Sequence, residues 1–306
     1  MGEKMKDNSL DIIKRTKFFA DKISNISLTE EISSNKTRVL LDNKPYVLGL
    51  YPINYFDKLK KEKIINEYLK NIDSLDTLDL YEIGIMPDIN KSYKIFEYRD
   101  EISLGEYLDK VSKDEVYKIG EKFGEILKNI HIKKIENHNC FDWYKNIETK
   151  VNFLLYRHGL SKISDNNDYI LIDYLSTNKY ICKNTALNPL YQNINEKNVR
   201  IFDGGEIDIR GLKEIKIGDG VSDFVNINKI AIKYPEFSKG VLDSYHSNDF
   251  VSRKFYRLLS FYQVYFVLES LVDIREKKNS YLNEHEIEEI FKMYDNFSEI
   301  IPSWAK

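Results

Sequence analysis

The segment 185–224 holds the residues of this chain whose types and spacing could do chemistry. Asn188 and Asn193 lie there, and beyond them come Gly211, Asp219 and Asp223. An amide can orient a hydroxyl group or ligate a metal through its oxygen, but it is not basic near neutrality. A lone neutral ligand also makes a poor Mg²⁺ site, because Mg²⁺ prefers charged oxygens in octahedral geometry. The two asparagines can therefore orient a ligand, but they cannot accept its proton.

The stretch 186–194, Ala-Leu-Asn-Pro-Leu-Tyr-Gln-Asn-Ile, resembles the catalytic loop of the aminoglycoside phosphotransferase family. That loop reads His-Gly-Asp, four residues and then Asn. Asn193 takes the position of the metal-binding Asn, which puts Asn188 in the slot of the catalytic Asp. The family's later acidic pairs match Arg210-Gly211, Gly218-Asp219 and Asp223-Phe224. The resemblance thus implies Gly211 in place of the Mg²⁺-binding Asp, and structural roles for Asp219 and Asp223.

Asp208 is an alternative metal ligand, because it lies only three residues before Gly211. An odd offset along a strand places a side chain on the opposite face of the sheet. We therefore expect Asp208 to be a solvent-exposed strand residue, which ligates a metal only if a β-bulge shifts the register.

Further segments resemble the same family in the same order along the chain: 83–87, 102–108, 119–131, 235–240 and 301–304. The resemblance covers nearly the whole chain. It implies an α+β, bilobal, protein-kinase-like fold. The expected N-lobe, residues 1–98, is small and β-rich, with an antiparallel sheet and one helix. The expected C-lobe, residues 99–306, is larger and mainly helical, and carries the catalytic-loop-like segment 185–224.

The hydrophobic pattern agrees with this order of elements. Short β-rich runs at 26–28, 37–41 and 46–48 precede a helical pattern at 57–72, and strand patterns follow at 79–85 and 93–98. The clearest helix spans 113–131, with an apolar stripe from Val116 to Ile130. Helical patterns recur at 141–157, 166–176, 235–246, 250–276 and 284–297, with short strands within 190–217.

The resemblance also implies positions for a nucleotide. Kinase chemistry uses a Lys to hold the phosphates, paired with a helix Glu. Gly49 occupies the Lys position, whereas Glu62 or Glu67 matches the Glu. The turn Ser33-Ser34-Asn35 matches the loop that covers the nucleotide, and its backbone N–H groups could bind an anion even without glycine. Glu97 and Tyr98, at the start of the hinge, complete the candidate cofactor-binding residues.

The composition limits the partners. A net charge of -3 and a pI near 6.1 give no basic bias, so nucleic acid is not expected as a partner. The first residues lack an apolar signal core, and the chain has no apolar run of the roughly 18 residues that a membrane span needs. We expect a cytoplasmic protein with a small-molecule ligand and no membrane partner.

The substitutions at Gly49, Asn188 and Gly211 together favour a catalytically degenerate kinase, a pseudokinase-type protein that binds a small molecule or acts as a scaffold. No tightly bound cofactor is expected in that case. An alternative is an active phosphotransferase with rearranged residues, which uses ATP or GTP with Mg²⁺ on an aminoglycoside or another hydroxyl-bearing small molecule. A second alternative is a structural protein, because spore-coat kinase-like proteins resemble the same family.

Overall fold

The computed structural model describes residues 11–133, 143–161 and 167–306. The chain divides into two compact units. The N-terminal unit comprises Met1–Ser103 and Arg200–Glu214, and the C-terminal unit comprises Leu104–Val199 and Ile215–Lys306. This division differs from the boundary expected after residue 98, because the segment 200–214 returns to pair with the end of the first segment.

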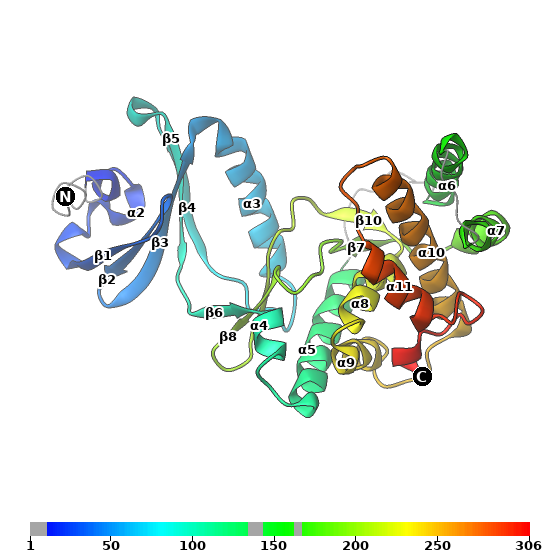
Figure 1. The fold of residues 1–306 in the computed structure, drawn as a ribbon. Helices are drawn as coiled ribbons and strands as arrows, with labels where there is room; N and C mark the ends of the chain where they lie inside the picture. Colours follow the sequence, from blue (N-terminus) through cyan, green and yellow to red (C-terminus); the bar gives the residue numbers. More distant parts are fainter. Residues whose placement is uncertain (1–10, 134–142, 162–166) are drawn as a thin grey trace. The chain divides into compact units, whose positions relative to one another are not determined.

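A five-stranded antiparallel sheet forms most of the N-terminal unit (Figure 1). Its order is β1-β2-β3-β5-β4, with β1 at Ile26–Ser33, β2 at Lys36–Leu41, β3 at Lys44–Pro52, β4 at Leu80–Met86 and β5 at Lys91–Glu97. The turn between β2 and β3 uses Asp42 and Asn43, both in the left-handed region that Asp and Asn tolerate. Each strand pairs antiparallel with its neighbours, as the sequence predicted.

The two faces of this sheet differ in character. Leu48 and Ile95, which are opposite each other, point into an apolar core with Ile13 and with Phe19 of α2 (Lys17–Ala20). Residues one position along each strand point to the other face. That face carries α3 (Phe56–Leu69), whose Glu62 bonds to Lys94 of β5.

A second small sheet completes the N-terminal unit. It contains β6 (Glu101–Ser103), β8 (Val199–Phe202) and β9 (Ile207–Ile209), in the order β6-β8-β9. The turn between β8 and β9 contains Gly204 and Gly205, both with positive φ. Short 3₁₀ turns occupy Ile23–Asn25, Ile53–Tyr55 and Pro87–Ile89.

The C-terminal unit is mainly helical. Its helices are α4 (Leu104–Leu108), α5 (Lys113–Ile132), α6 (Trp143–Leu160), α7 (Asp168–Asn178), α8 (Phe224–Ala231), α9 (Pro235–Tyr245), α10 (Arg253–Arg275) and α11 (Glu284–Met293). Two short strands, β7 (Asn188–Leu190) and β10 (Lys216–Gly218), pair antiparallel. The 3₁₀ turns are η4 (Lys179–Cys182), η5 (Gly220–Asp223) and η6 (Ser303–Ala305). An antiparallel sheet followed by a mostly helical region confirms the predicted fold class.

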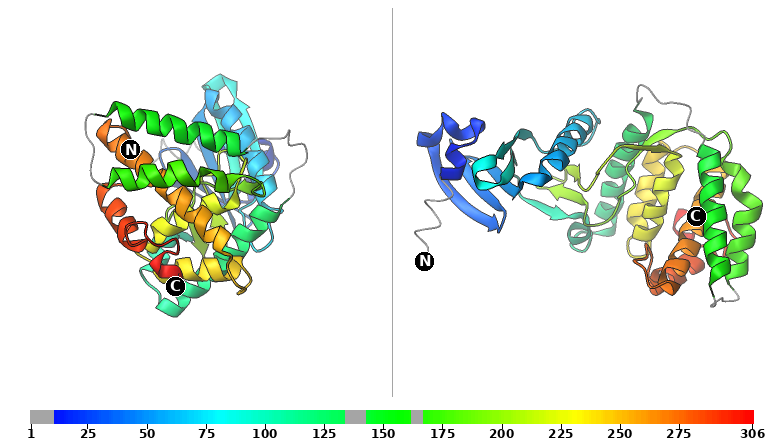
Figure 2. Two further views of the ribbon diagram at one scale, coloured as in Figure 1. Left: turned by 90° about the vertical axis from the view of Figure 1, so that its right-hand side faces the viewer. Right: turned by 90° about the horizontal axis from the view of Figure 1, so that it is seen from above.

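α5 packs against α9, and α10 packs against α6 and α7. α5 begins with a capping box between Ser112 and Glu115. It then packs tightly against α9, because a Cβ at Gly120 would lie only 2.2 Å from the carbonyl oxygen of Phe237. α6 and α7 lie beside α10 in both views of Figure 2. No helix within the described ranges is long and apolar enough to cross a membrane.

Candidate functional site

The asparagine-rich loop at 191–198 follows directly from β7. Asn188 itself lies in the strand, opposite Gly218 of β10, and its amide donates a 2.8 Å hydrogen bond to the carbonyl of His131 at the end of α5. Asn193 lies in the loop beyond the strand. The two asparagines that the sequence placed on one loop are therefore on different elements, and the Asn188 side chain ties β7 to α5.

Asp223 anchors the start of this loop. Its carboxylate accepts hydrogen bonds from the backbone N–H of Tyr191 and of Gln192, both at 2.8 Å. The third partner is His131 Nε2, at 3.1 Å. Only 1% of the Asp223 surface is exposed, so these donors replace the water that a buried carboxylate loses.

His131 connects this anchor to α9. Its Nδ1 lies 2.8 Å from the hydroxyl of Tyr245. Because the Asp223 carboxylate can only accept, Nε2 carries the proton and Nδ1 accepts from the tyrosine. The family-like His at the end of α5 therefore supports the carboxylate that holds the loop.

Side-chain amides brace the rest of the loop. Asn195 Oδ1 accepts from the N–H groups of Lys197 and Asn198, each at 3.0 Å. The amides of Asn195 and Asn198 both donate to the carbonyl of Asn193 at 3.2 Å. Asn193 thus sits at the centre of a braced turn, and its own side chain remains an amide that cannot act as a base.

Asp219 closes the turn that leads into α8. Its Oδ1 accepts from Val221 N–H at 3.0 Å and its Oδ2 accepts from the Tyr262 hydroxyl at 3.0 Å. Burial raises the pKa of this carboxyl group, and the two hydrogen bonds oppose that shift. Asp219 is thereby committed to contacts within the C-terminal unit.

In the N-terminal unit, two lysines flank the glycine at the expected lysine position. Gly49 of β3 pairs with Lys36 of β2 on one side and with Lys94 of β5 on the other. Directly opposite residues in an antiparallel sheet project to the same face. The Tyr51 ring covers the glycine, since a Cβ built there would lie 2.9 Å from the Tyr51 hydroxyl oxygen. The position where a kinase lysine was expected, Gly49, therefore has a lysine beside it on each neighbouring strand.

Lys94 forms an ion pair with Glu62, the helix glutamate that the sequence singled out. Its ammonium lies 2.6 Å from the carboxylate of Glu62 on α3. The side chains are 21% and 35% exposed, so the pair is only partly screened by water. The same ammonium lies 5.2 Å from the ring centroid of Phe96 and 5.7 Å from that of Tyr51. Glu67, the other candidate, lies 3.9 Å from Lys63 on the same helix.

Lys36 adds positive charge to this face. Burial lowers its pKa, and the charges of Lys94, Arg210 and Arg200 lower it further. Within the described residues, no carboxylate forms an ion pair with the Lys36 ammonium. Glu101 offsets part of the charge, because it contacts Arg210 at 2.6 Å and Arg200 at 3.6 Å. The surroundings of Lys36 therefore favour an anionic ligand.

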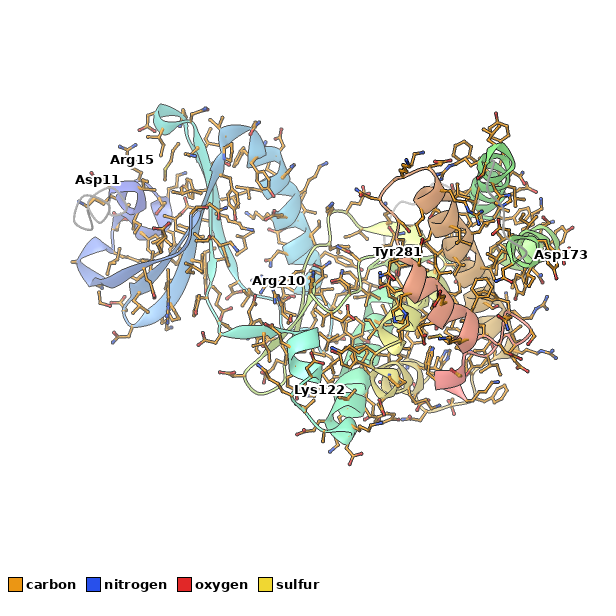
Figure 3. The ribbon with its side chains drawn as sticks, viewed as in Figure 1. Asp11, Arg15, Lys122, Asp173, Arg210 and Tyr281 are labelled. Carbon is orange, nitrogen blue, oxygen red and sulfur yellow. The ribbon has the colours of Figure 1, made fainter. Side chains whose placement is uncertain are left out.

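Asp208 corrects the sequence expectation. It was expected to be solvent-exposed, but only 1% of its surface is accessible, because β9 is buried at all three positions. Burial raises its pKa to about 6, although Arg210, labelled in Figure 3, lies 2.6 Å away and favours the charged form. The carboxylate is paired within its own unit.

The residues present do not form a magnesium site of the expected kind. Gly211 follows β9 at φ +76° and has no side chain. Asn198 and Asn193 contribute neutral groups to the braced loop. No cluster of three His, Cys, Asp or Glu suited to a metal occurs in the part of the chain that the structure describes. A donor set without a charged oxygen suits Mg²⁺ poorly.

The remaining candidate cofactor residues lie at the ends of strands. Ser33 donates to the Asn35 side chain at 3.0 Å across the exposed turn at Ser34. Glu97 accepts from Arg99 at 2.8 Å and from the N–H of Asp79 at 3.2 Å. The Tyr98 hydroxyl donates to Asp100 at 2.9 Å, and the Arg38 guanidinium lies 4.3 Å from the centroid of its ring. The nucleotide contacts of all these residues stay predictions.

Sequence reasoning missed three residues of these sites: Lys36, Lys94 and Asn198. The lysines were missed because strand pairing, which places them beside Gly49, cannot be read from local sequence. A signal for Asn198 was present, because the spacing of Asn188 to Asn193 recurs between Asn193 and Asn198.

No protein-family model matches the sequence, and no curated protein matches it. Solved structures do match. A thermostable aminoglycoside phosphotransferase APH(4)-Ia, in a ternary complex with ADP and hygromycin B, is 13% identical; the match covers 86% of this chain and 92% of that one with a TM-score of 0.57. The streptomycin–ATP ternary complex of APH(2″)-IIa is 14% identical over 98% and 97%, with a TM-score of 0.53. Choline kinase LicA from Streptococcus pneumoniae is 14% identical over 95% and 99%, with a TM-score of 0.50. The chain therefore has the kinase-like fold shared by aminoglycoside phosphotransferases and choline kinase.

Proposed function

We propose that this protein binds a nucleotide or similar phosphate compound on a small-molecule-kinase fold and does not transfer phosphate efficiently. The observation that carries the proposal is the anchoring of Tyr191 and Gln192 by Asp223. In the resembling family, the corresponding acidic residue fixes the catalytic loop through backbone hydrogen bonds. The anchored residues therefore mark where that loop begins in this chain.

This anchor supports a new register for the loop. Tyr191-Gln192-Asn193 then takes the place of His-Gly-Asp, and after four intervening residues Asn198 takes the place of the metal-binding Asn. Asn188, the earlier candidate, is part of strand β7. The revised register keeps the earlier conclusion, because the catalytic Asp is still replaced by an amide. An amide cannot accept the proton of a substrate hydroxyl.

The second part of the proposal is that Lys94 replaces the lysine missing at Gly49. The 2.6 Å pair with Glu62 supports this assignment, since kinases hold the phosphate-binding Lys with a helix Glu. Lys36 supplies a second cation on the same face. ADP and ATP in the solved structures of this fold support a nucleotide as the ligand. Phosphate binding would then survive although the usual lysine is absent.

A transfer assay tests the proposal. Protein is incubated with Mg²⁺, γ-labelled ATP or GTP, and aminoglycoside, choline and sugar acceptors. We expect no label on any acceptor above the protein-free background. Mg²⁺-dependent transfer to any acceptor would establish the alternative, an active phosphotransferase.

Variants of the loop test the register. We expect the pair Asn193→Asp and Gly211→Asp to gain slow transfer, because it restores a base and a metal ligand. The matched pair Asn188→Asp and Gly211→Asp should gain none. Gain in the second pair alone would restore the original register, with Asn188 at the catalytic position.

A further inference from the structure

A separate cavity opens within the C-terminal unit, between the end of α7 and the start of α10. Its volume is about 380 Å³. Its polar lining comprises Thr177, Asn178, Tyr180, Lys183, Lys254 and Arg257. None of these residues belongs to the loop at 191–198 or to the lysine-flanked sheet face. The cavity is therefore a candidate site in its own right.

The lining carries uncompensated positive charge. It contains two lysines and an arginine, and no Asp or Glu lines it. Among the described residues, no carboxylate forms an ion pair with Lys183, Lys254 or Arg257. The charge of Lys254 lowers the pKa of Asp219, but the Asp219 oxygens accept hydrogen bonds from Val221 N–H and the Tyr262 hydroxyl and form no ion pair with Lys254. Because the whole chain has a net charge of -3, this local concentration of cations does not reflect the general composition.

The positions of these cations are set by neighbouring elements. The Lys183 ammonium lies 4.7 Å from the ring centroid of Tyr144 and 5.7 Å from that of Tyr180. Lys254 and Arg257 are one turn apart on α10, whose first turn contains no acidic residue. α7, which carries the labelled Asp173 in Figure 3, contributes Thr177 and Asn178 from its last turn. Cations from two segments and polar groups from a third therefore share one cavity.

We propose that this cavity binds a phosphate-bearing small molecule. Arginine bonds phosphate oxygens in a bidentate fork, and lysine acts as a mobile point charge. Thr177, Asn178 and Tyr180 add hydroxyl and amide groups to the lining. The volume lies in the range of about 300–1,000 Å³ that small-molecule sites occupy. A phosphate ester would neutralise the three cations and could form hydrogen bonds with Thr177, Asn178 and Tyr180.

Calorimetric titration with inorganic pyrophosphate tests this site. The titrations use full-length protein carrying Lys94→Met, in which binding on the sheet face is weakened. Arg257→Glu is compared with Arg253→Glu, which makes the same charge change on an exposed residue four positions earlier on the same helix that does not line the cavity. We expect Arg257→Glu to weaken binding about tenfold or more and Arg253→Glu to weaken it far less.

Two results would overturn the proposal. One is the absence of pyrophosphate binding to the Lys94→Met protein. The other is an equal loss of affinity in the two charge-reversal variants, which would indicate diffuse attraction rather than a site. Matching urea unfolding curves for both variants would show that neither result arises from misfolding.

Discussion

Under the proposed function, the sheet of the N-terminal unit and the loop of the C-terminal unit depart from the kinase pattern in different ways. On the sheet, the lysine position is Gly49, yet Lys36 and Lys94 surround it from the neighbouring strands. In the loop, Asp223 still holds the backbone at Tyr191 and Gln192, but the next residue is an amide, Asn193. The proposal therefore has the sheet supply its phosphate-binding charge from neighbouring strands, whereas the loop keeps its backbone anchor without a general base.

This difference has a physical reason. Neighbouring positions on one sheet face lie about 5 Å apart, so a long lysine side chain from any of three strands can reach the same anion. A general base must instead lie within hydrogen-bond reach of a single proton. Positive charge can therefore move between strands during evolution, while a catalytic carboxylate cannot move without losing its function.

The largest expected effect comes from removing the loop anchor with Asp223→Ala. It leaves His131 and two backbone N–H groups without their buried acceptor, so we expect a loss of about 3–5 kcal/mol in unfolding free energy. Urea unfolding would measure it, with Asp249→Ala on the exposed surface as the control, expected within about 0.5 kcal/mol. A loss below about 1 kcal/mol for Asp223→Ala would show that the loop keeps its frame without this anchor.

Asp208 is a buried carboxylate in the N-terminal unit. Burial raises the pKa of its carboxyl group to about 6. A raised folded-state pKa means that the native state binds more protons than the unfolded state between about pH 4 and 6, so stability falls as pH rises through that range. Relative to Asp208→Asn, the unmutated protein should therefore lose about 2 kcal/mol between pH 4.5 and 7.5.

Urea unfolding of both proteins at the two pH values measures this difference. The attraction of Arg210 favours the ionised form of Asp208 and is already included in the pKa of about 6, so it needs no separate correction. A stability difference that does not change with pH would show that Asp208 stays ionised in the folded protein throughout this range.

Lys94→Met tests whether the sheet has kept its phosphate-binding charge. Losing a charge-assisted contact of about 1.5–3 kcal/mol should weaken nucleotide binding tenfold to hundredfold. Stability should change by less than about 1 kcal/mol, because the Glu62 pair is partly exposed. Lys44→Met, an exposed lysine at the start of β3, is the matched control. Equal nucleotide affinities in the two variants would show that Lys94 does not bind the phosphates.

The smallest expected effect belongs to Asn188→Ala. It removes one neutral hydrogen bond to the His131 carbonyl, so we expect a loss of about 1 kcal/mol in unfolding free energy and no change in nucleotide binding. If Asn188→Ala weakened nucleotide binding more than Asn193→Ala does, Asn188 and not Asn193 would be the residue that contacts the ligand. Parallel titrations of the two variants make the comparison.

The family resemblance, together with a hydrophobic periodicity that agreed with it, was enough to predict the fold. The strand runs at 37–41 and 46–48 and the helix at 113–131 correspond to β2, β3 and α5. Local sequence patterns did not predict the features that depend on tertiary packing, namely the burial of single residues and the register of the loop. Asp208, which was expected to be exposed, is buried. From the sequence we predicted only the register that starts at Asn188, although the same spacing recurs between Asn193 and Asn198. The Asp223 contacts, which depend on tertiary structure, support the second register that we propose.

One measurement tests both halves of the comparison. The protein is equilibrated with Mg²⁺, γ-labelled ATP and a hydroxyl-bearing acceptor, and the label retained by the protein is chromatographed. The account predicts that label is retained, that Lys94→Met lowers the retention about tenfold or more, and that the retained label runs as intact ATP. Transfer of the label to the acceptor, or retention that does not depend on Lys94, would contradict it.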